Sequence, residues 1–425
     1  MSMLTTVRNG CPAAVLLFLL AGCANDVPAY ACFTVETSHG VVDFPYEVCV
    51  ACADPEGKRI AYRLAFGDGD TSAWSDYLPS GDTWTVSHAW RQPGIYWVMY
   101  QLRDEEGYVS EFRWEYGEPG RGLRIEIGAL DFPYRVVDTI RVGVGATGVA
   151  LSPDGGLLYV TNSVENTVSV VRTDGDSVVA TVAVGQGPEA VAVTPSGDYV
   201  YVANRAGDDV SVIRTSDNVV VDTLPANYDP VDMAFRPDGR YLYVAIRREN
   251  DVLVIRTADN EREKMIQTAF KPEAVLATPD GRWVLVACSS DDSVQFIDPE
   301  TNEVTGSWPT IREPVAFAAP AAGSPVYVLG RMSQLQALTP PGGPAARSGS
   351  GGLGSLEAHD IAALPDDRYL YVSQPGLFRV VVVDPELRFI CAIPVGTEPR
   401  RMAVHPDGQR VYVADCGYSV YVIGR

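Results

Sequence analysis

Five polar residues that recur at a nearly constant spacing are the candidates for chemistry in this 425-residue chain. They are Thr147, Glu189, Glu273, His359 and Arg400, and Val231 and Val315 occupy the same position in two further copies of the pattern. Two carboxylates, an imidazole and a guanidinium around one axis could bind a metal ion or a polar ligand. The competing interpretation is a polar mouth whose side chains face water, and a single histidine in the set favours that interpretation.

The chain lacks the linear signatures of the common enzyme classes. It has no GxSxG, HExxH or Walker motif, and no GxGxxG that opens a helix. Its four histidines leave little material for histidine-based catalysis. Lys and Arg number 33 against 54 Asp and Glu, and the resulting charge of −21 argues against a nucleic-acid partner. The sequence therefore predicts no cofactor, no catalytic residue and no nucleic-acid partner.

A unit of about 42 residues, repeated seven times after residue 134, must position the five candidates. Its core is a strand fragment such as Tyr159-Val160-Thr161-Asn162, and the valine of this fragment recurs as Val202, Val244, Val286, Val328, Val372 and Val413. A turn such as Pro153-Asp154-Gly155 precedes most copies, and each unit has room for four strands. This spacing is typical of a β-propeller blade, so residues 134–425 are predicted to form a seven-bladed propeller.

These repeats resemble the YVTN family of extracytoplasmic propellers, which includes YncE-like and surface-layer proteins. The resemblance implies a fold whose polar sites lie where the inner strands meet the central channel. Some seven-bladed relatives are lactonases, lyases or haem carriers. A lactonase-like hydrolase or a lyase that uses the axial funnel is therefore the alternative to a binding protein.

The two ends of the repeat region are complementary. Residues 419–425 read as the third strand of the seventh unit, which lacks a fourth strand after them. Residues 136–140 match the fourth strand at 178–182, so residues 134–143 are predicted to close the last blade. A Gly- and Ser-rich stretch, 342–354, is predicted as a flexible loop.

Residues 31–128 form a separate predicted domain of short apolar strands and turns. Residues 64–70 (LAFGDGD), His88 and the run 94–98 (GIYWV) resemble the PKD family, an immunoglobulin-like β-sandwich. Leu64 and Trp90 depart from the family pattern at two aromatic positions. The resemblance implies a spacer, with His88 as a packed residue; calcium at Asp68 and Asp70 stays an alternative to a simple tight turn. The fold class is thus all-β, a sandwich followed by a propeller.

The N-terminus resembles a bacterial lipoprotein signal. Arg8 precedes the apolar run 13–20, which is too short to span a bilayer, and Leu20-Ala21-Gly22-Cys23 follows it. This resemblance implies that residues 1–22 are a signal peptide, that Cys23 is lipidated and that 23–30 form a tether. Ala24 after the cysteine favours an outer membrane or the cell surface.

Six further cysteines would lie in an oxidising compartment, and their pairing is left open: Cys32, Cys49, Cys52, Cys288, Cys391 and Cys416. Taken together, these patterns predict a lipid-anchored, extracytoplasmic protein with a binding or scaffolding role. Its propeller loops would recognise an envelope protein or a glycan, and the PKD-like domain would act as a spacer.

Overall fold

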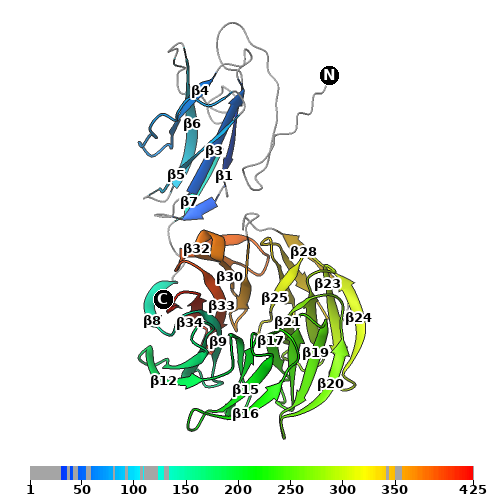
Figure 1. Ribbon diagram of the computed structural model, residues 1–425. Helices are drawn as coiled ribbons and strands as arrows, with labels where there is room; N and C mark the ends of the chain where they lie inside the picture. Colours follow the sequence, from blue (N-terminus) through cyan, green and yellow to red (C-terminus); the bar gives the residue numbers. More distant parts are fainter. Residues whose placement is uncertain are drawn as a thin grey trace. The chain divides into compact units, whose positions relative to one another are not determined.

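The computed structural model of the chain is all-β and consists of two compact units, residues 1–132 and 133–425 (Figure 1). The residues that it describes are 30–35, 39–41, 46–53, 59–79, 82–90, 94–105, 109, 123–128, 134–340, 344–349 and 357–424. The predicted signal peptide and Cys23 lie outside this range, and so does the tether except for Tyr30. Among the described residues, no helix has the length and apolar character needed to cross a membrane.

The first unit is a sandwich of two sheets. One sheet has the order β1-β3-β5, formed by β1 (Tyr30–Val35), β3 (Tyr46–Ala53) and β5 (Thr83–His88). The other has the order β2-β7-β6-β4, formed by β2 (His39–Val41), β7 (Leu123–Gly128), β6 (Gly94–Asp104) and β4 (Ile60–Ala65). Leu64 and Trp90, which depart from the PKD pattern, are both fully buried, and Trp90 Nε1 donates to the Phe66 carbonyl at 3.0 Å. Both substitutions therefore keep the core filled.

His88 has a structural role in this sandwich. Its ring stacks on Phe66 with 3.9 Å between centroids, and its Nε2 lies 2.7 Å from Asp68 Oδ2. Asp68 Oδ1 also accepts the backbone N–H of Asp70 at 3.1 Å, which fixes the turn.

The second unit is a seven-bladed propeller, as predicted, and each blade is a four-stranded antiparallel sheet. Blades 1 to 4 contain β9 (Ala146–Leu151), β10 (Leu157–Asn162), β11 (Thr167–Arg172) and β12 (Ser177–Ala183); β13 (Pro188–Val193), β14 (Tyr199–Asn204), β15 (Asp209–Arg214) and β16 (Val219–Pro225); β17 (Pro230–Phe235), β18 (Tyr241–Ile246), β19 (Asp251–Arg256) and β20 (Glu261–Gln267); β21 (Pro272–Ala277), β22 (Val284–Cys288), β23 (Ser293–Asp298) and β24 (Glu303–Pro309). Blades 5 to 7 contain β25 (Pro314–Ala318), β26 (Val326–Gly330), β27 (Leu335–Leu338) and β28 (Pro344–Gly349); β29 (Asp360–Ala363), β30 (Leu370–Gln374), β31 (Arg379–Val383) and β32 (Phe389–Pro394), with a 3₁₀ turn at Pro375–Leu377; β33 (Pro399–Val404), β34 (Arg410–Asp415), β35 (Ser419–Gly424) and β8 (Arg135–Arg141). In Figure 1 the labelled first strands β9, β17, β21, β25 and β33 lie near the centre of the ring, and the fourth strands β8, β12, β16, β20, β24 and β28 lie at the rim.

Burial explains this arrangement of the strands. The second strand of a blade is packed on both faces by neighbouring blades, so β26 and β30 are buried at every residue. Six tyrosines of the repeated strand fragment are among the largest fully buried side chains: Tyr159, Tyr201, Tyr243, Tyr327, Tyr371 and Tyr412. The fourth strand, as in β24, alternates between exposed and half-buried residues because its outer face meets water.

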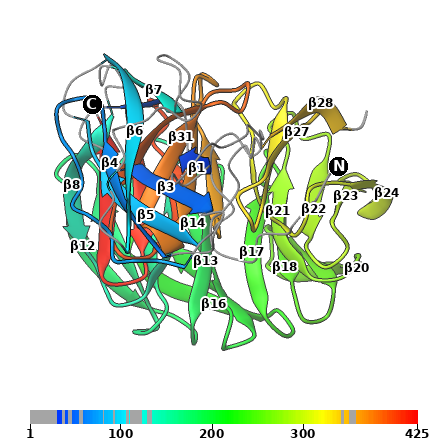
Figure 2. The same ribbon diagram turned by 90° about the horizontal axis from the view of Figure 1, so that it is seen from above.

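The seventh blade takes its outermost strand from the start of the propeller. Strand β8 pairs antiparallel with β35, with Ile140 opposite Val420 and Arg135 opposite Gly424. Tyr134 is buried and donates its hydroxyl to the Gly408 carbonyl at 3.1 Å. Strands β8 and β12 lie side by side in both views (Figure 1, Figure 2), which makes blades 7 and 1 neighbours.

The Gly- and Ser-rich stretch is only partly a loop. Within it, residues 344–349 form β28, which pairs with β27 through Leu335 and Gly349. An outermost strand needs backbone pairing on one edge only and no large side chains, so a sequence that reads as a flexible loop can complete the blade.

Cys288, Cys391 and Cys416 carry free thiols. Burial raises the pKa of the Cys288 and Cys391 thiols to about 12, so these groups are inert thiols in the core. The side chains of Cys32, Cys49 and Cys52 lie outside the part of the chain that the structure describes.

Candidate functional site

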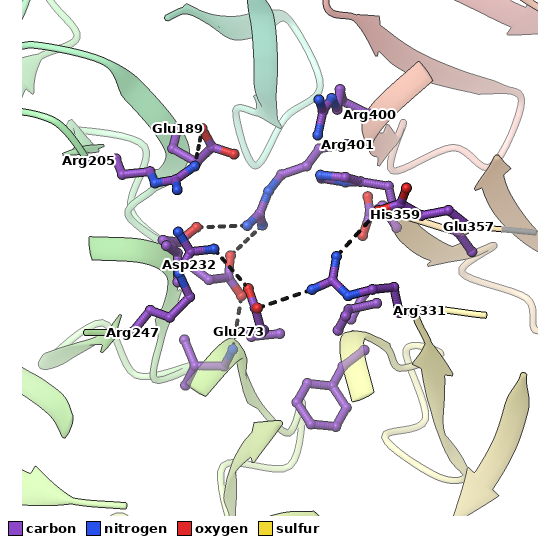
Figure 3. Close-up of a pocket in the computed structure, with 18 residues that line it drawn as sticks. Glu189, Arg205, Asp232, Arg247, Glu273, Arg331, Glu357, His359, Arg400 and Arg401 are labelled. Carbon is purple, nitrogen blue, oxygen red and sulfur yellow. Dashed lines mark hydrogen bonds and ion pairs between the residues drawn. The ribbon is translucent and has the colours of Figure 1, made fainter. Parts of the chain in front are cut away.

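A cavity of about 190 Å³ lies at the propeller axis, where the inner strands meet the loops of blades 2 to 7 (Figure 3). Its charged lining consists of Glu189, Arg205, Asp232, Arg247, Glu273, Arg331, Glu357, Asp360, Arg400 and Arg401, with His359 among them. Ala and Val residues and Phe317 form the rest of the wall.

β-Bulges in the inner strands bring these side chains to the axis. In β17, Pro230 pairs with Ile246 and Asp232 with Ala245, so Val231 is an extra residue without a partner across the strand pair. The same irregularity occurs at Glu189, at Glu273 and at Arg400 and Arg401. A bulge re-aims the side chains around it, and consecutive residues of one strand therefore both reach the cavity.

Arg401 crosses the axis. Its Nη1 donates to Asp232 Oδ1 and its Nη2 to the Val231 carbonyl at 2.8 Å, which joins blade 7 to blade 3 (Figure 3). Asp232 Oδ2 also accepts the backbone N–H of Val275 at 2.9 Å. Burial disfavours the charged guanidinium, but the carboxylates of Asp232 and Asp360 outweigh this and raise the pKa of Arg401.

Asp360 forms a second link between blades. Its Oδ2 accepts the backbone N–H of Met402 at 2.7 Å, from the inner strand of the next blade. Burial raises the pKa of Asp360 to about 6, although Arg401 opposes the shift. Asp360 therefore keeps its proton to a higher pH than an ordinary aspartic acid does.

Glu273 is the centre of the second group of charges. Its carboxylate lies 3.3 Å from Arg247, 3.1 Å from Arg331 and 3.4 Å from Lys271. Arg247 in turn pairs with Asp229 at 2.8 Å. The Glu273 carboxylate is thus shared by three cations, and the Arg247 guanidinium is shared by two carboxylates. Such a network is held in place before any ligand arrives.

His359 is neutral in this setting. Burial and the neighbouring charges of Arg400, Arg401 and Arg331 hold the pKa of its imidazole well below the ordinary value. Its buried Nδ1 has no hydrogen-bond partner, and neither does the buried Nε of Arg400. These two atoms are polar groups of the cavity that a small ligand could satisfy.

The structure brings four of the five predicted funnel residues to this cavity: Glu189, Glu273, His359 and Arg400. Val231 and Val315 line it as well. The fifth, Thr147, does not line the cavity. Its buried Oγ1 lies 3.0 Å from Thr161 Oγ1 and donates to the Pro188 carbonyl at 3.1 Å, so it ties blade 1 to blade 2.

The repeat alignment missed the residues that dominate the electrostatics. Asp232, Asp360 and Arg401 occupy the next position of the same alignment, one residue further along each unit. Arg331 occupies the position after the second strand that Arg205 and Arg247 take in their own blades. Charged residues at these two repeat positions were the signal in the sequence that could have identified them as cavity residues.

The described residues of the cavity lining contain no group of three metal-ligating side chains close enough together to share an ion. Among the described residues, the group of three side chains close enough to share a metal ion is Asp68, Asp70 and His88, whose ligand atoms lie within 4.8 Å of one another. It belongs to the first unit, where the Asp68 carboxylate already binds the backbone N–H of Asp70 and His88 Nε2. Calcium at Asp68 and Asp70 stays an alternative to a simple tight turn.

Fold and site together define an all-β protein with a β-sandwich and a propeller that carries a charged axial cavity. Residues 32–111 match the family model of the PKD domain, and residues 146–261 match the YNCE-like beta-propeller. The chain thus has a PKD domain at its N-terminal side and a seven-bladed propeller whose residues 146–261 match the YNCE-like model.

No curated protein matches the sequence. Among solved structures, a chain of Kuenenia stuttgartiensis Hydrazine Synthase is similar, with a TM-score of 0.60 and 24% sequence identity. The match covers 67% of this chain and 97% of that one. At this identity the likeness shows a shared fold and nothing about chemistry.

Proposed function

We propose that this protein is a non-catalytic binding or scaffolding protein of the cell envelope. One face of the propeller would recognise a partner, and the PKD domain would act as a spacer. The combination of a propeller and a PKD domain fits a binding or scaffold role, because a rigid ring presents many loops at fixed positions.

Two faces of the ring must be distinguished. The loop face consists of the loops after the second strand of each blade and the loops that join consecutive blades. Backbone bonds such as Arg205 N to the Gly187 carbonyl, at 2.9 Å, hold these two sets of loops together. The turn face lies opposite and carries the Pro-Asp-Gly turns.

The exposure of large apolar side chains differs between the two faces, and this observation carries the proposal. On the loop face seven such side chains are exposed: Val144, Val164, Tyr228, Phe270, Met332, Phe378 and Tyr418. Among the described residues, the strand ends next to the turn face expose two such side chains, Tyr199 and Val219. The outermost strands expose four valines at the rim: Val137, Val178, Val179 and Val221. Exposed apolar groups concentrated on one face are typical of an interaction surface.

Site-specific photocrosslinking tests this proposal. A photoreactive phenylalanine analogue at position 270 should give a discrete adduct in envelope fractions of the source cell. The same analogue at position 199, an exposed aromatic position on the opposite face, is the matched control. Adducts of equal yield at both positions, or at neither, would contradict a binding role for the loop face.

The location of the protein is part of the same proposal. The predicted lipobox supports attachment of the exported chain to a membrane through Cys23, with an outer membrane or the cell surface favoured by Ala24. A diacyl anchor is sufficient for stable attachment, whereas a single acyl chain gives only marginal binding.

A further inference from the structure

The residue just before the third strand plays the same backbone role in most blades. Its carbonyl accepts the N–H of the first residue of the loop that leads to the next blade. The carbonyl of Asn166 accepts the N–H of Val184 at 3.0 Å. The same bond joins the Phe378 carbonyl to the Val395 N–H at 3.0 Å and the Tyr418 carbonyl to the Val142 N–H at 2.9 Å. These positions are therefore structurally equivalent.

In blades 1 to 4 this residue is Asn or Asp, and its side chain makes a second link. The side-chain oxygens of Asn166, Asp208, Asn250 and Asp292 each accept a backbone N–H from the loop to the next blade at 2.8 to 3.0 Å. All four residues have positive φ, a conformation that Asn and Asp adopt more readily than other non-glycine residues. The sequence here is thus explained by the fold alone.

Blades 6 and 7 place aromatic residues at the same position. Phe378 has a φ of 55° and is 56% exposed, and Tyr418 is 55% exposed. In these two blades other groups accept the N–H that an Asn side chain would have bound. The backbone N–H of Glu398 donates to Asp415 Oδ1 at 2.6 Å, and the backbone N–H of Gly145 donates to the Gly417 carbonyl at 2.7 Å. A bulky residue with positive φ, exposed to water and without a role in the core, points to a function outside the fold.

The loops near the two aromatic residues expose further apolar side chains on the loop face. The loops of blades 6, 7 and 1 also expose Val144 and Val164. Val164 lies close against the loop that contains Val144, because a Cβ added to the neighbouring Gly145 would be only 2.8 Å from Val164 Cγ2. The charged residues of these six loops are Glu165 and Glu398, and the guanidinium of Arg141, the last residue of β8, lies 5.2 Å from the centre of the Tyr418 ring. We call Val144, Val164, Phe378 and Tyr418 the aromatic arc.

We propose that the aromatic arc binds an apolar segment of another protein flanked by basic side chains. This inference rests on the proposed function and names its partner class and the part of the face that is used. Both charged residues of the arc loops are acidic, and together with the chain charge of −21 they outweigh the single positive charge of Arg141 beside Tyr418. Basic flanking groups are therefore complementary, and a second copy or an anionic membrane is repelled. A glycan is disfavoured because these loops are rich in glycine and valine and offer few side chains to its hydroxyls.

Selection from a displayed library of random peptides on the immobilised full-length protein tests this. Enriched peptides should combine apolar and basic residues, and a labelled synthetic copy should bind the wild-type protein. The double variant F378N/Y418N, which restores the residue type of blades 1 and 3, should weaken this binding about 30-fold or more. Because Asn suits the positive φ at position 378, the single variant Phe378→Asn should unfold at a temperature no lower than that of the wild type, and it provides a folded variant for the same binding assay.

The matched control is Tyr228→Asn, which removes an exposed aromatic residue from the other side of the same face and should change the affinity less than about threefold. No enrichment of peptides, or binding that F378N/Y418N leaves intact, would overturn the inference. Dimerisation of the wild-type protein, or binding to phosphatidylglycerol vesicles, that is lost in the double variant would overturn it as well. If crosslinking at position 270 still finds a partner in those cases, the proposed function stands and only the aromatic arc is refuted.

Discussion

Replacing Arg401 by Met should destabilise the propeller, because Arg401 is the cation that joins two opposite blades. The side chains of Arg401 and Asp232 are 25% and 11% exposed, so the pair is mostly but not fully desolvated. Removing one partner of a buried pair costs about 3–5 kcal/mol, and partial exposure reduces this to about 2–3 kcal/mol. For a unit of this size we expect the unfolding midpoint to fall by about 5 °C.

Calorimetry of the full-length protein measures this, with Asp232→Asn and the double variant completing a cycle. An Asn at position 232 can still accept the Val275 N–H but carries no charge to be left unpaired. The double variant should therefore be more stable than the sum of the two single losses predicts, by about 1–2 kcal/mol. A loss below about 0.5 kcal/mol for Arg401→Met, or strictly additive losses, would refute the claim that this pair joins the blades.

Four further outcomes follow from the structure. Burial raises the pKa of Asp360 from 3.8 to about 6, so the folded state binds more protons than the unfolded state between those pH values. The free energy of unfolding should therefore fall as pH rises from about 4 to about 6, and Asp360→Asn should flatten that part of a pH–stability curve. Phe378→Asn should stabilise the propeller by about 0.5–1 kcal/mol in thermal unfolding, whereas Asn250→Phe should destabilise it, and the opposite order would contradict the equivalence of the two positions. Deleting residues 134–143, which include β8, should leave a chain that aggregates and unfolds with poor cooperativity by calorimetry, and an unchanged melting profile would argue against closure by β8. Cys23→Ser should move the protein from the membrane to the soluble fraction of lysed cells, as followed by immunoblotting, and retention in the membrane would exclude a lipid anchor at Cys23.

The fold could be predicted from the sequence because its determinants are local and repeated. A strand fragment, a Pro-Asp-Gly turn and a spacing of about 42 residues occur together, so period and turn chemistry agree on one architecture. The PKD pattern tolerated two substitutions because Leu64 and Trp90 still fill the core. The one error in the strands, at β28, arose where backbone pairing and not side-chain pattern forms the strand.

The site was predictable only in part. The repeat alignment found the position of Glu273 and His359, since equivalent residues of a ring point at the same axis. It could not show that a β-bulge also brings the next residue to the cavity, nor that Arg401 reaches Asp232 from 169 residues away. The bulge is a backbone feature of one strand pair that the residue pattern does not mark, and the contact of Arg401 depends on the closed ring, which no single unit contains.

The exposed residue Phe378 illustrates a different limit. In the sequence it is one aromatic residue in a loop after a strand, and nothing there marks its backbone as left-handed. Only comparison with Asn166 and Asn250 in the folded ring shows that the fold would accept Asn at this position. The functional signal is therefore a departure from a structural rule that the other blades follow.

Amide hydrogen exchange of the propeller, with and without the partner found by crosslinking, tests most directly whether the loop face is the binding surface. Binding at the aromatic arc should slow exchange in residues 142–145, 163–166, 375–378 and 416–418 and leave the turns at 153–156 and 195–198 unchanged. Slowed exchange confined to those turns, or spread equally over both faces, would contradict recognition through the loop face.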